Sequence, residues 1–143
     1  MMKRRHVLVL PACAVLSAPA VHAADAMNPE LRRKAKRAVA GGLHYLRGQQ
    51  AADGSLLKSV GITALALRAF LESPEQYNEA DGAFVTRQVD YLLANVKSDG
   101  SISASLQSTA YNTAVALSAL AATKNPKHDA VIAAARKFLI GHQ

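Results

Sequence analysis

The chain has 143 residues, half of them hydrophobic, and this length suits one globular domain. It has no Trp and only 5% aromatic residues, so its core has to be built from Ala, Leu and Val. The formal net charge of +7 becomes +4 when Lys3, Arg4 and Arg5 are set aside as part of a targeting segment. A nucleic-acid partner is therefore not expected.

The first residues have the composition of an export signal. The basic run Lys3-Arg4-Arg5 precedes a short apolar core at 7–16, and Val21-His22-Ala23 has the pattern of a cleavage site before Ala24. An apolar core of about ten residues is too short to cross a bilayer. We predict that residues 1–23 form a signal helix that is cleaved, that residues 24–143 are the mature domain, and that this domain is periplasmic or extracellular.

Two other signal types remain open as alternatives. Residues 3–8 loosely fit a twin-arginine signal, which implies export after folding. Leu10-Pro11-Ala12-Cys13 loosely resembles a bacterial lipobox, which would make Cys13 a lipid anchor, although Pro11 and the short apolar core argue against it. With simple cleavage Cys13 is removed, and the mature chain has no cysteine for a disulfide.

The first two predicted helices differ in charge. The helix at 28–49 begins with Asn28 as its cap and Pro29 in its first turn. Its apolar stripe is formed by Leu31, Ala35, Ala38, Val39, Leu43 and Leu46. The second helix, at 60–72, has Ser59 as its cap and only Arg68 as a charged residue before its end. A helix that is apolar on nearly all sides is usually buried.

Three more helices are predicted after a polar link. Residues 73–82 form that link, in which Pro74 could begin a short helical turn. The third helix, at 83–96, has an apolar stripe, and the fourth, at 106–123, has no charged residue. The fifth starts with Asn125-Pro126, which repeats the start of the first helix, and runs toward Gly141.

A turn motif occurs twice and organises the chain. Asp53-Gly54-Ser55 follows the first helix, and Asp99-Gly100-Ser101 follows the third, 46 residues later. Asp turns the backbone through its side chain, and Gly adopts the positive φ that ends a helix. A segment in the following helices, 61–70 and 111–120, also repeats, but with an offset of 50. We therefore expect a two-helix repeat with about four residues of slack between copies.

The charge pattern predicts an all-α fold with two helix layers. The first, third and fifth helices are amphipathic, whereas the second and fourth are almost uncharged. This alternation is typical of an inner layer of helices covered by an outer layer. A third copy of the repeat begins at 138–143, so we expect about two and a half hairpins, with the chain ending inside its own repeat.

These motifs resemble the α/α-toroid repeats of terpenoid cyclases, above all squalene–hopene cyclases, and of protein prenyltransferases. The family signature is an aromatic-Leu pair, a Gln and then Gly-x-Trp; the first copy here has Tyr45-Leu46, Gln50 and Asp53-Gly54-Ser55-Leu56. The second copy keeps Tyr91-Leu92 and the turn, but Val96 replaces Gln and Ile102 replaces Trp. The resemblance covers 28–143 and implies an incomplete α/α-toroid, because the family ring needs about twice as many hairpins.

The catalytic parts of the resembling family do not carry over to this sequence. Cyclases use an acidic Asp-x-Asp-Asp cluster, which is absent here, and a toroid of the thioester type would need Gly-Cys-x-Glu-Gln, which is also absent. Prenyltransferases hold zinc, but His44, His128 and His142 do not have the spacing of a metal site. The sequence therefore predicts no catalytic residue, no metal and no cofactor.

Two groups of polar residues are candidate functional sites. Asp53 and Asp99 could be paired carboxylates, but their identical repeat positions favour a structural role, shared with Gln50, Gly54, Ser55, Gly100 and Ser101. Tyr111, Asn112 and Thr113 form the one polar cluster on the fourth helix; they could line a central cavity, although a hydrogen-bonding role is favoured.

The basic run at 32–37 has three interpretations. A solvated outer face is favoured, because no aromatic residues interleave for base stacking, and anionic lipid and nucleic acid are the alternatives.

The preferred functional hypothesis is an exported, noncatalytic helical-hairpin repeat protein that acts as a scaffold or binding module. Its partner would be an apolar ligand or a protein, and the exposed flanks of an incomplete toroid could support self-association. The alternative is the N-terminal fragment of a terpenoid-cyclase-like enzyme, an isomerase whose acidic cluster would lie beyond residue 143.

Overall fold

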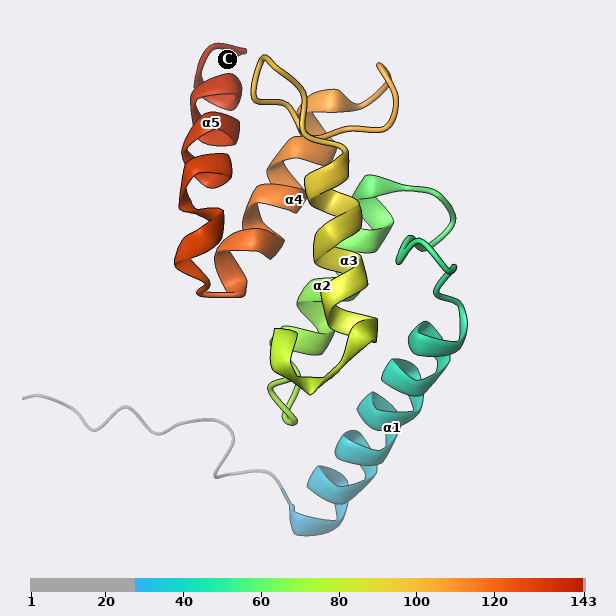
Figure 1. Cartoon of the computed structure of the whole chain (residues 1–143). Coiled ribbons are helices and arrows are strands. Elements are labelled where there is room, and N and C mark those ends of the chain that lie inside the picture. The colour runs from blue at the N-terminus through green and yellow to red at the C-terminus, as the bar shows by residue number, and fades with distance from the viewer. Residues whose placement is uncertain (1–27, 143) are drawn as a thin grey trace, which may run out of the picture.

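The computed structural model describes residues 28–142, and every regular element in this range is helical (Figure 1). The α-helices and short 3-10 helices are α1 Pro29–Gly48, α2 Val60–Leu71, η1 Glu79–Asp81, α3 Ala83–Ala94, α4 Thr109–Ala122, η2 Pro126–His128 and α5 Asp129–Ile140. The all-α prediction is confirmed. The predicted export signal at 1–23, including Cys13, lies outside the described residues.

An asparagine caps α1 and each of the two short helices, η1 and η2, that precede α3 and α5. Asn28 Oδ1 accepts the amide of Glu30 at 2.8 Å, and Asn125 Oδ1 accepts the amide of Lys127 at 3.1 Å. Asn78 caps η1 in the same way, at 2.8 Å from the amide of Ala80. Ser59 caps α2 as predicted, accepting the amide of Ile62 at 3.3 Å. Local side chains therefore determine where α1, α2 and the short helices η1 and η2 begin.

One boundary difference lies at the start of α4. The sequence predicts a start near residue 106, whereas the helix begins at Thr109. Residues 103–108 instead form a loop, in which Ser103 Oγ donates to the carbonyl of Ser105 at 2.7 Å and Ser108 has φ of 58°. Serine hydroxyls that bond nearby backbone groups compete with helix formation, which explains the later start.

Helix α2 packs against both α3 and α4, and α4 also packs against α5 (Figure 1). The core between them includes the side chains of Leu67, Phe70, Val85, Leu92 and Leu120, all at most 2% exposed. Phe70, Tyr77 and Phe84 make edge-to-face contacts with centroids 5.2–5.9 Å apart. The almost uncharged helices α2 and α4 are therefore direct neighbours.

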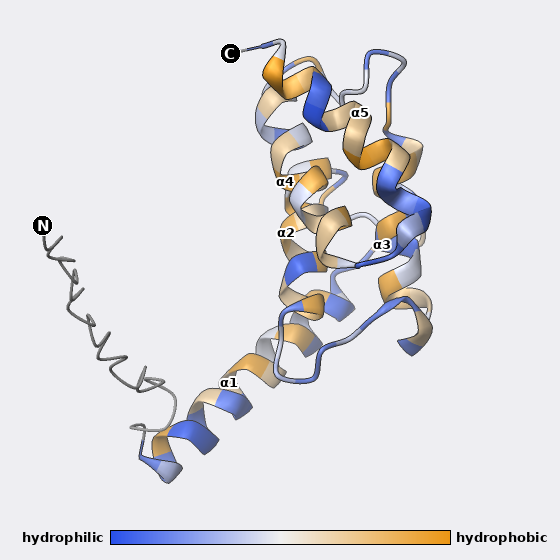
Figure 2. Cartoon of the chain, turned by 90° about the vertical axis from the view of Figure 1, so that its left-hand side faces the viewer, coloured by the Kyte–Doolittle hydropathy of each residue, from blue (hydrophilic) through white to orange (hydrophobic). Residues whose placement is uncertain are grey.

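Helix α1 differs from the expectation of a buried apolar stripe. Leu43 is its one buried residue, and Leu46 is half-buried, so the helix meets α2 near its C-terminal end. Leu31 and Val39 belong to the same stripe but are 56% and 41% exposed. The other helices lie beyond reach of the first half of α1, so periodicity alone predicted more burial than the packing provides (Figure 2).

The segments before α3 and α5 are tied together by one carboxylate. Glu79 Oε1 accepts Asn125 Nδ2 at 2.9 Å and lies 3.1 Å from Nε2 of His128, which is buried. Burial raises the pKa of Glu79, but the hydrogen bonds from Asn125 and His128 outweigh it, so the pKa lies below its usual value. His128 therefore has a structural partner.

Candidate functional site

The two Asp-Gly-Ser turns have the same backbone. In the first, the amide of Ala51 donates to the carbonyl of Ser55 at 2.9 Å; in the second, Lys97 donates to Ser101 at 2.8 Å. The central glycines have φ of 87° and 86°, a region that side chains disfavour. The turns are thus structural repeats as well as sequence repeats.

Each turn is anchored to the helix that follows it by a buried threonine. Thr63 Oγ1 accepts the amide of Leu56 at 2.9 Å and donates to the carbonyl of Ser59 at 2.7 Å. Thr113 Oγ1 accepts the amide of Ile102 at 3.0 Å and donates to the carbonyl of Thr109 at 2.7 Å. Sequence analysis missed Thr63, although Thr63 and Thr113 occupy matching positions in the repeated segments.

Each turn also lies directly against a later helix. A Cβ on Gly54 would lie 2.0 Å from the carbonyl oxygen of Arg87 in α3, and one on Gly100 would lie 2.6 Å from that of Ala134 in α5. Asp53 and Asp99 therefore sit against different helices, and no interaction joins their carboxylates within residues 28–142.

Gln50 strengthens the first of these contacts. Its Nε2 donates to the carbonyl of Phe84 at 2.8 Å and to that of Gly54 at 3.2 Å. Val96 takes the matching position in the second copy and instead forms an isolated bridge with Ile102. The predicted structural group of Gln50, Asp53, Gly54 and Ser55 is therefore brought together in one place.

The two turns differ in what surrounds the aspartate. Asp53 Oδ1 accepts the amide and hydroxyl of Ser55 at 3.1 and 2.7 Å, and Asp53 Oδ2 accepts Lys58 Nζ at 2.7 Å. Asp99 Oδ1 accepts the amide of Ser101 at 2.9 Å, but no lysine or arginine pairs with Asp99 in the described part of the chain.

The loop after the turn also differs in length between the two copies. Thr63 is seven positions after Leu56, whereas Thr113 is eleven positions after Ile102, so the four extra residues predicted for the second copy lie here. Lys58 matches Ala104 or Ser108, according to which end of the loop is aligned, and neither residue carries a charge. The lysine of the first copy thus has no counterpart in the second.

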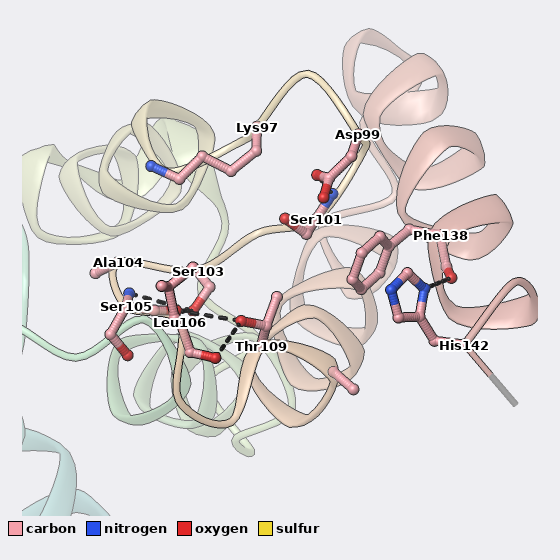
Figure 3. Close-up of a pocket in the computed structure, with 11 residues that line it drawn as sticks. Lys97, Asp99, Ser101, Ser103, Ala104, Ser105, Leu106, Thr109, Phe138 and His142 are labelled. Carbon is pink, nitrogen blue, oxygen red and sulfur yellow. Dashed lines mark hydrogen bonds between the residues drawn. The ribbon is translucent and has the colours of Figure 1, made fainter.

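The longer loop borders a groove with a volume of about 520 Å³ (Figure 3). The groove runs between the loop, the second turn and the end of α5, and its lining includes Lys97, Asp99, Ser101, Leu106, Phe138 and His142. Phe138 is only 8% exposed and forms a wall, whereas Leu106 is 97% exposed on the loop. In Figure 3 the Lys97 ammonium group points away from Asp99.

His142 is oriented by the end of α5. Its Nδ1 donates to the carbonyl of Phe138 at 2.8 Å, and its ring lies 4.0 Å from the Phe138 ring. Asn95 makes the same bond at the end of α3, donating from Nδ2 to the carbonyl of Tyr91 at 2.9 Å. His142 therefore caps its helix as Asn95 does.

The electrostatics of both aspartates favour the ionised form. Hydrogen bonds from Lys58 and Ser55 lower the pKa of Asp53 from 3.8 to about 2. The backbone amide of Ser101, then its hydroxyl, lower the pKa of Asp99, and the charge of His142 acts in the same direction. Asp99 is thus a carboxylate at neutral pH, exposed in the groove.

Tyr111, Asn112 and Thr113 do not line this groove. Tyr111 is 55% exposed, Asn112 Nδ2 donates to Ser103 Oγ at 3.0 Å, and Thr113 is buried against the amide described above. A Cβ on Gly61 would lie 2.7 Å from Asn112 Oδ1, so Gly61 permits the close approach of α2 and α4 at this point. The described geometry thus assigns Asn112 and Thr113 hydrogen-bonding roles. His44 is exposed on α1.

The groove was not predicted, because it arises where the two copies differ and not from the residues that they share. Two features of the second copy could have indicated the groove: it keeps the aspartate but lacks the lysine, and its loop has an insertion. In repeat proteins an insertion often lies on the binding face.

No match was found when the chain was compared with models of protein families, with curated proteins and with solved structures. Within residues 28–142 no cluster of His, Cys, Asp and Glu has the arrangement of a metal site. No helix in this range has the length and hydropathy needed to span a membrane.

Proposed function

We propose that the chain is an exported, noncatalytic binding module built from α/α-toroid hairpins, with α2 and α4 as inner helices and α1, α3 and α5 as outer helices. The recurring contacts support this arrangement. Each turn is anchored to the following helix by a threonine, and each turn glycine lies against a later helix. The composition of residues 1–23 supports export.

The groove at the second turn is the proposed binding site, and its partner is a protein that presents a lysine side chain. One observation carries this proposal: in the first copy, Lys58 places its ammonium group 2.7 Å from the matching aspartate, Asp53. The second copy retains the carboxylate as Asp99, without a lysine in that place. A lysine from a partner would restore the pairing.

The groove offers apolar surface as well as the carboxylate of Asp99. An exposed ion pair alone contributes about 0.2–1 kcal/mol, too little for recognition. The alkyl chain of a bound lysine would also lie along Phe138 and Leu106, because lysine stems cover apolar surface while the head group stays polar. A single lysine would then bind in the millimolar range, which corresponds to about 4 kcal/mol.

Titration of the isotope-labelled protein with acetyl-Gly-Lys-Gly-amide tests this proposal by NMR. We expect saturable shifts at the amides of Asp99, Ser101 and His142. A matched peptide with norleucine in place of lysine keeps the alkyl chain but lacks the charge, and it should cause much smaller shifts. Equal shifts with both peptides would contradict recognition of the ammonium group.

Two variants locate the binding. Asp99→Asn should weaken binding of the lysine peptide by up to about fivefold, because the neutral amide cannot form the ion pair. Asp53→Asn is the matched control, since it makes the same change in the turn whose aspartate is already occupied by Lys58. Equal weakening in Asp53→Asn, or an unchanged affinity in Asp99→Asn, would refute the proposed site.

A further inference from the structure

The first half of α1 is an exposed amphipathic helix that extends away from the other helices (Figure 2). Leu31 and Val39 are 56% and 41% exposed, and Ala35 and Ala38 on the same stripe are exposed as well. Because this face has no cover within the described residues, the question is which kind of partner fits it.

The repeat shows that this face has the pattern of a packing surface. With the turn offset of 46, Val39 matches Val85 of α3, and Leu43 matches Val89. Val85 and Val89 are 0% and 1% exposed, in the face of α3 that packs on α2. Val39 therefore occupies a position that is buried in the next copy but exposed in this one.

Positive charges surround this apolar stripe. Five of the six residues from 32 to 37 are basic, whereas Glu30, which pairs with Lys34 at 2.9 Å, is the one acidic residue of α1. At about 100° per residue, Lys34 lies about 60° to one side of Leu31, and Arg32 and Lys36 lie about 100–140° to the other. An apolar stripe bordered by Lys and Arg is the pattern of a helix at a membrane surface.

We propose that α1 docks on an anionic lipid surface, with its axis in the membrane plane and the stripe from Leu31 to Val39 facing the acyl chains. The clustered cations then lie at the level of the lipid phosphates, and the charges are complementary. This inference goes beyond the proposed function and uses a different part of the molecule.

Other occupants fit the face less well. A second copy of α1 would bring two clusters of five like charges together, which opposes pairing. A nucleic acid would match the charge, but α1 has no aromatic side chain before Tyr45 to stack on bases, and the apolar stripe would stay in water.

Vesicle sedimentation tests the proposal with the full chain. We compare vesicles of phosphatidylcholine containing about 30% phosphatidylserine with vesicles of phosphatidylcholine alone. Binding should be at least about tenfold stronger to the anionic vesicles and should weaken as salt shortens the Debye length. Equal binding to both kinds of vesicle would overturn the proposal.

A charge variant and a matched control identify the helix responsible. The triple variant Arg33→Gln, Lys36→Gln, Arg37→Gln should weaken binding by about 100-fold, at roughly a factor of five for each cation. The control Lys124→Gln, Arg136→Gln, Lys137→Gln removes the same charge from exposed sites outside α1 and should change binding less than about threefold. Equal losses in both would show that only net charge matters, and the proposal would fail.

The apolar stripe is tested separately. Leu31→Ser with Val39→Ser keeps every charge and should weaken binding to anionic vesicles by about tenfold or more, because two exposed apolar side chains lose their contact with lipid. If this variant binds vesicles normally while duplex RNA competes for the same cations, the surface is a polyanion site and the lipid proposal is wrong. The variants in α1 change no residue that lines the groove, so lysine-peptide binding should be unchanged in them, which separates the two proposals.

Discussion

Replacing Gly54 by alanine tests whether the first turn holds the two copies together. The residue has φ of 87°, and an added Cβ would lie 2.0 Å from the carbonyl oxygen and 2.8 Å from the Cβ of Arg87. Both facts oppose a side chain, because the left-handed backbone is strained and the contacts are with parts of α3 that cannot rotate away. The turn has to move away from α3 in the variant.

The expected cost follows from these two effects. A left-handed conformation costs an L-residue about 1–2 kcal/mol. Forcing extra volume into a packed contact costs about 1–3 kcal/mol more. Together they give about 2–5 kcal/mol, a large part of the 5–15 kcal/mol of a typical domain. In urea unfolding followed by circular dichroism, the midpoint should fall by about 1–3 M.

Gly41→Ala is the matched control for this substitution. Gly41 lies inside α1, and a Cβ there would meet nothing within 4 Å. Alanine should therefore stabilise α1 by about 0.5–1 kcal/mol. Gly100→Ala should destabilise less than Gly54→Ala, because its nearest contact is 2.6 Å. The reasoning is refuted if Gly54→Ala unfolds within about 0.5 kcal/mol of wild type, or if it matches the control.

Three further substitutions test other contacts. Thr63→Val should lower the free energy of unfolding by about 1–3 kcal/mol, since it leaves the buried amide of Leu56 without its acceptor. Thr63→Ser keeps the hydroxyl and should retain most of the wild-type stability in the same urea assay. Gln88→Met should raise the urea midpoint by the equivalent of about 1 kcal/mol or more, because Gln88 is fully buried and its amide atoms have no partner among the described residues; a lowered midpoint would argue against this. The pKa of Asp53 is about 2 when folded and 3.8 as the reference value, so its contribution to stability is present above pH 4 and is lost as the pH falls toward 2. Asp53→Asn should therefore make the melting temperature less dependent on pH in this window, and an unchanged pH profile would exclude the assigned hydrogen bonds.

Local sequence signals predicted most of the secondary structure. The caps at Asn28, Ser59 and Asn125 begin helical segments as expected, because each side chain accepts an amide of the first turn that follows it. Asn78 does the same at η1, a short helix within the segment that was predicted as a polar link. Capping residues can be predicted from the sequence because a cap depends on residues only a few positions away in the chain.

Comparison of the two copies predicted the contacts that they share better than the contacts in which they differ. The turn glycines and aspartates were identified as structural residues because they recur. The groove depends on Lys58 having no counterpart and on a loop that is four residues longer, and both are departures from the repeat. A search for periodicity averages out such departures, although in a repeat protein a site specific to one copy has to arise from them.

Burial could be predicted for α2 but less well for α4, although α4 has no charged residue. Seven of the twelve residues of α2 are buried, whereas four of the fourteen residues of α4 are buried. Helix α2 contacts α1, α3 and α4, but α4 contacts mainly α2 and α5, and Tyr111 on its open side is 55% exposed. The composition of a helix thus determines which of its faces can be buried. The number of neighbouring helices determines which of these faces are buried in the fold. The same reasoning applies to α1, where Val39 is exposed and Val85, its counterpart in α3, is not. The exposed apolar faces of α1 and α4 have no cover in the described structure. Binding should therefore be tested on these two faces, beginning with the binding of α1 to lipid.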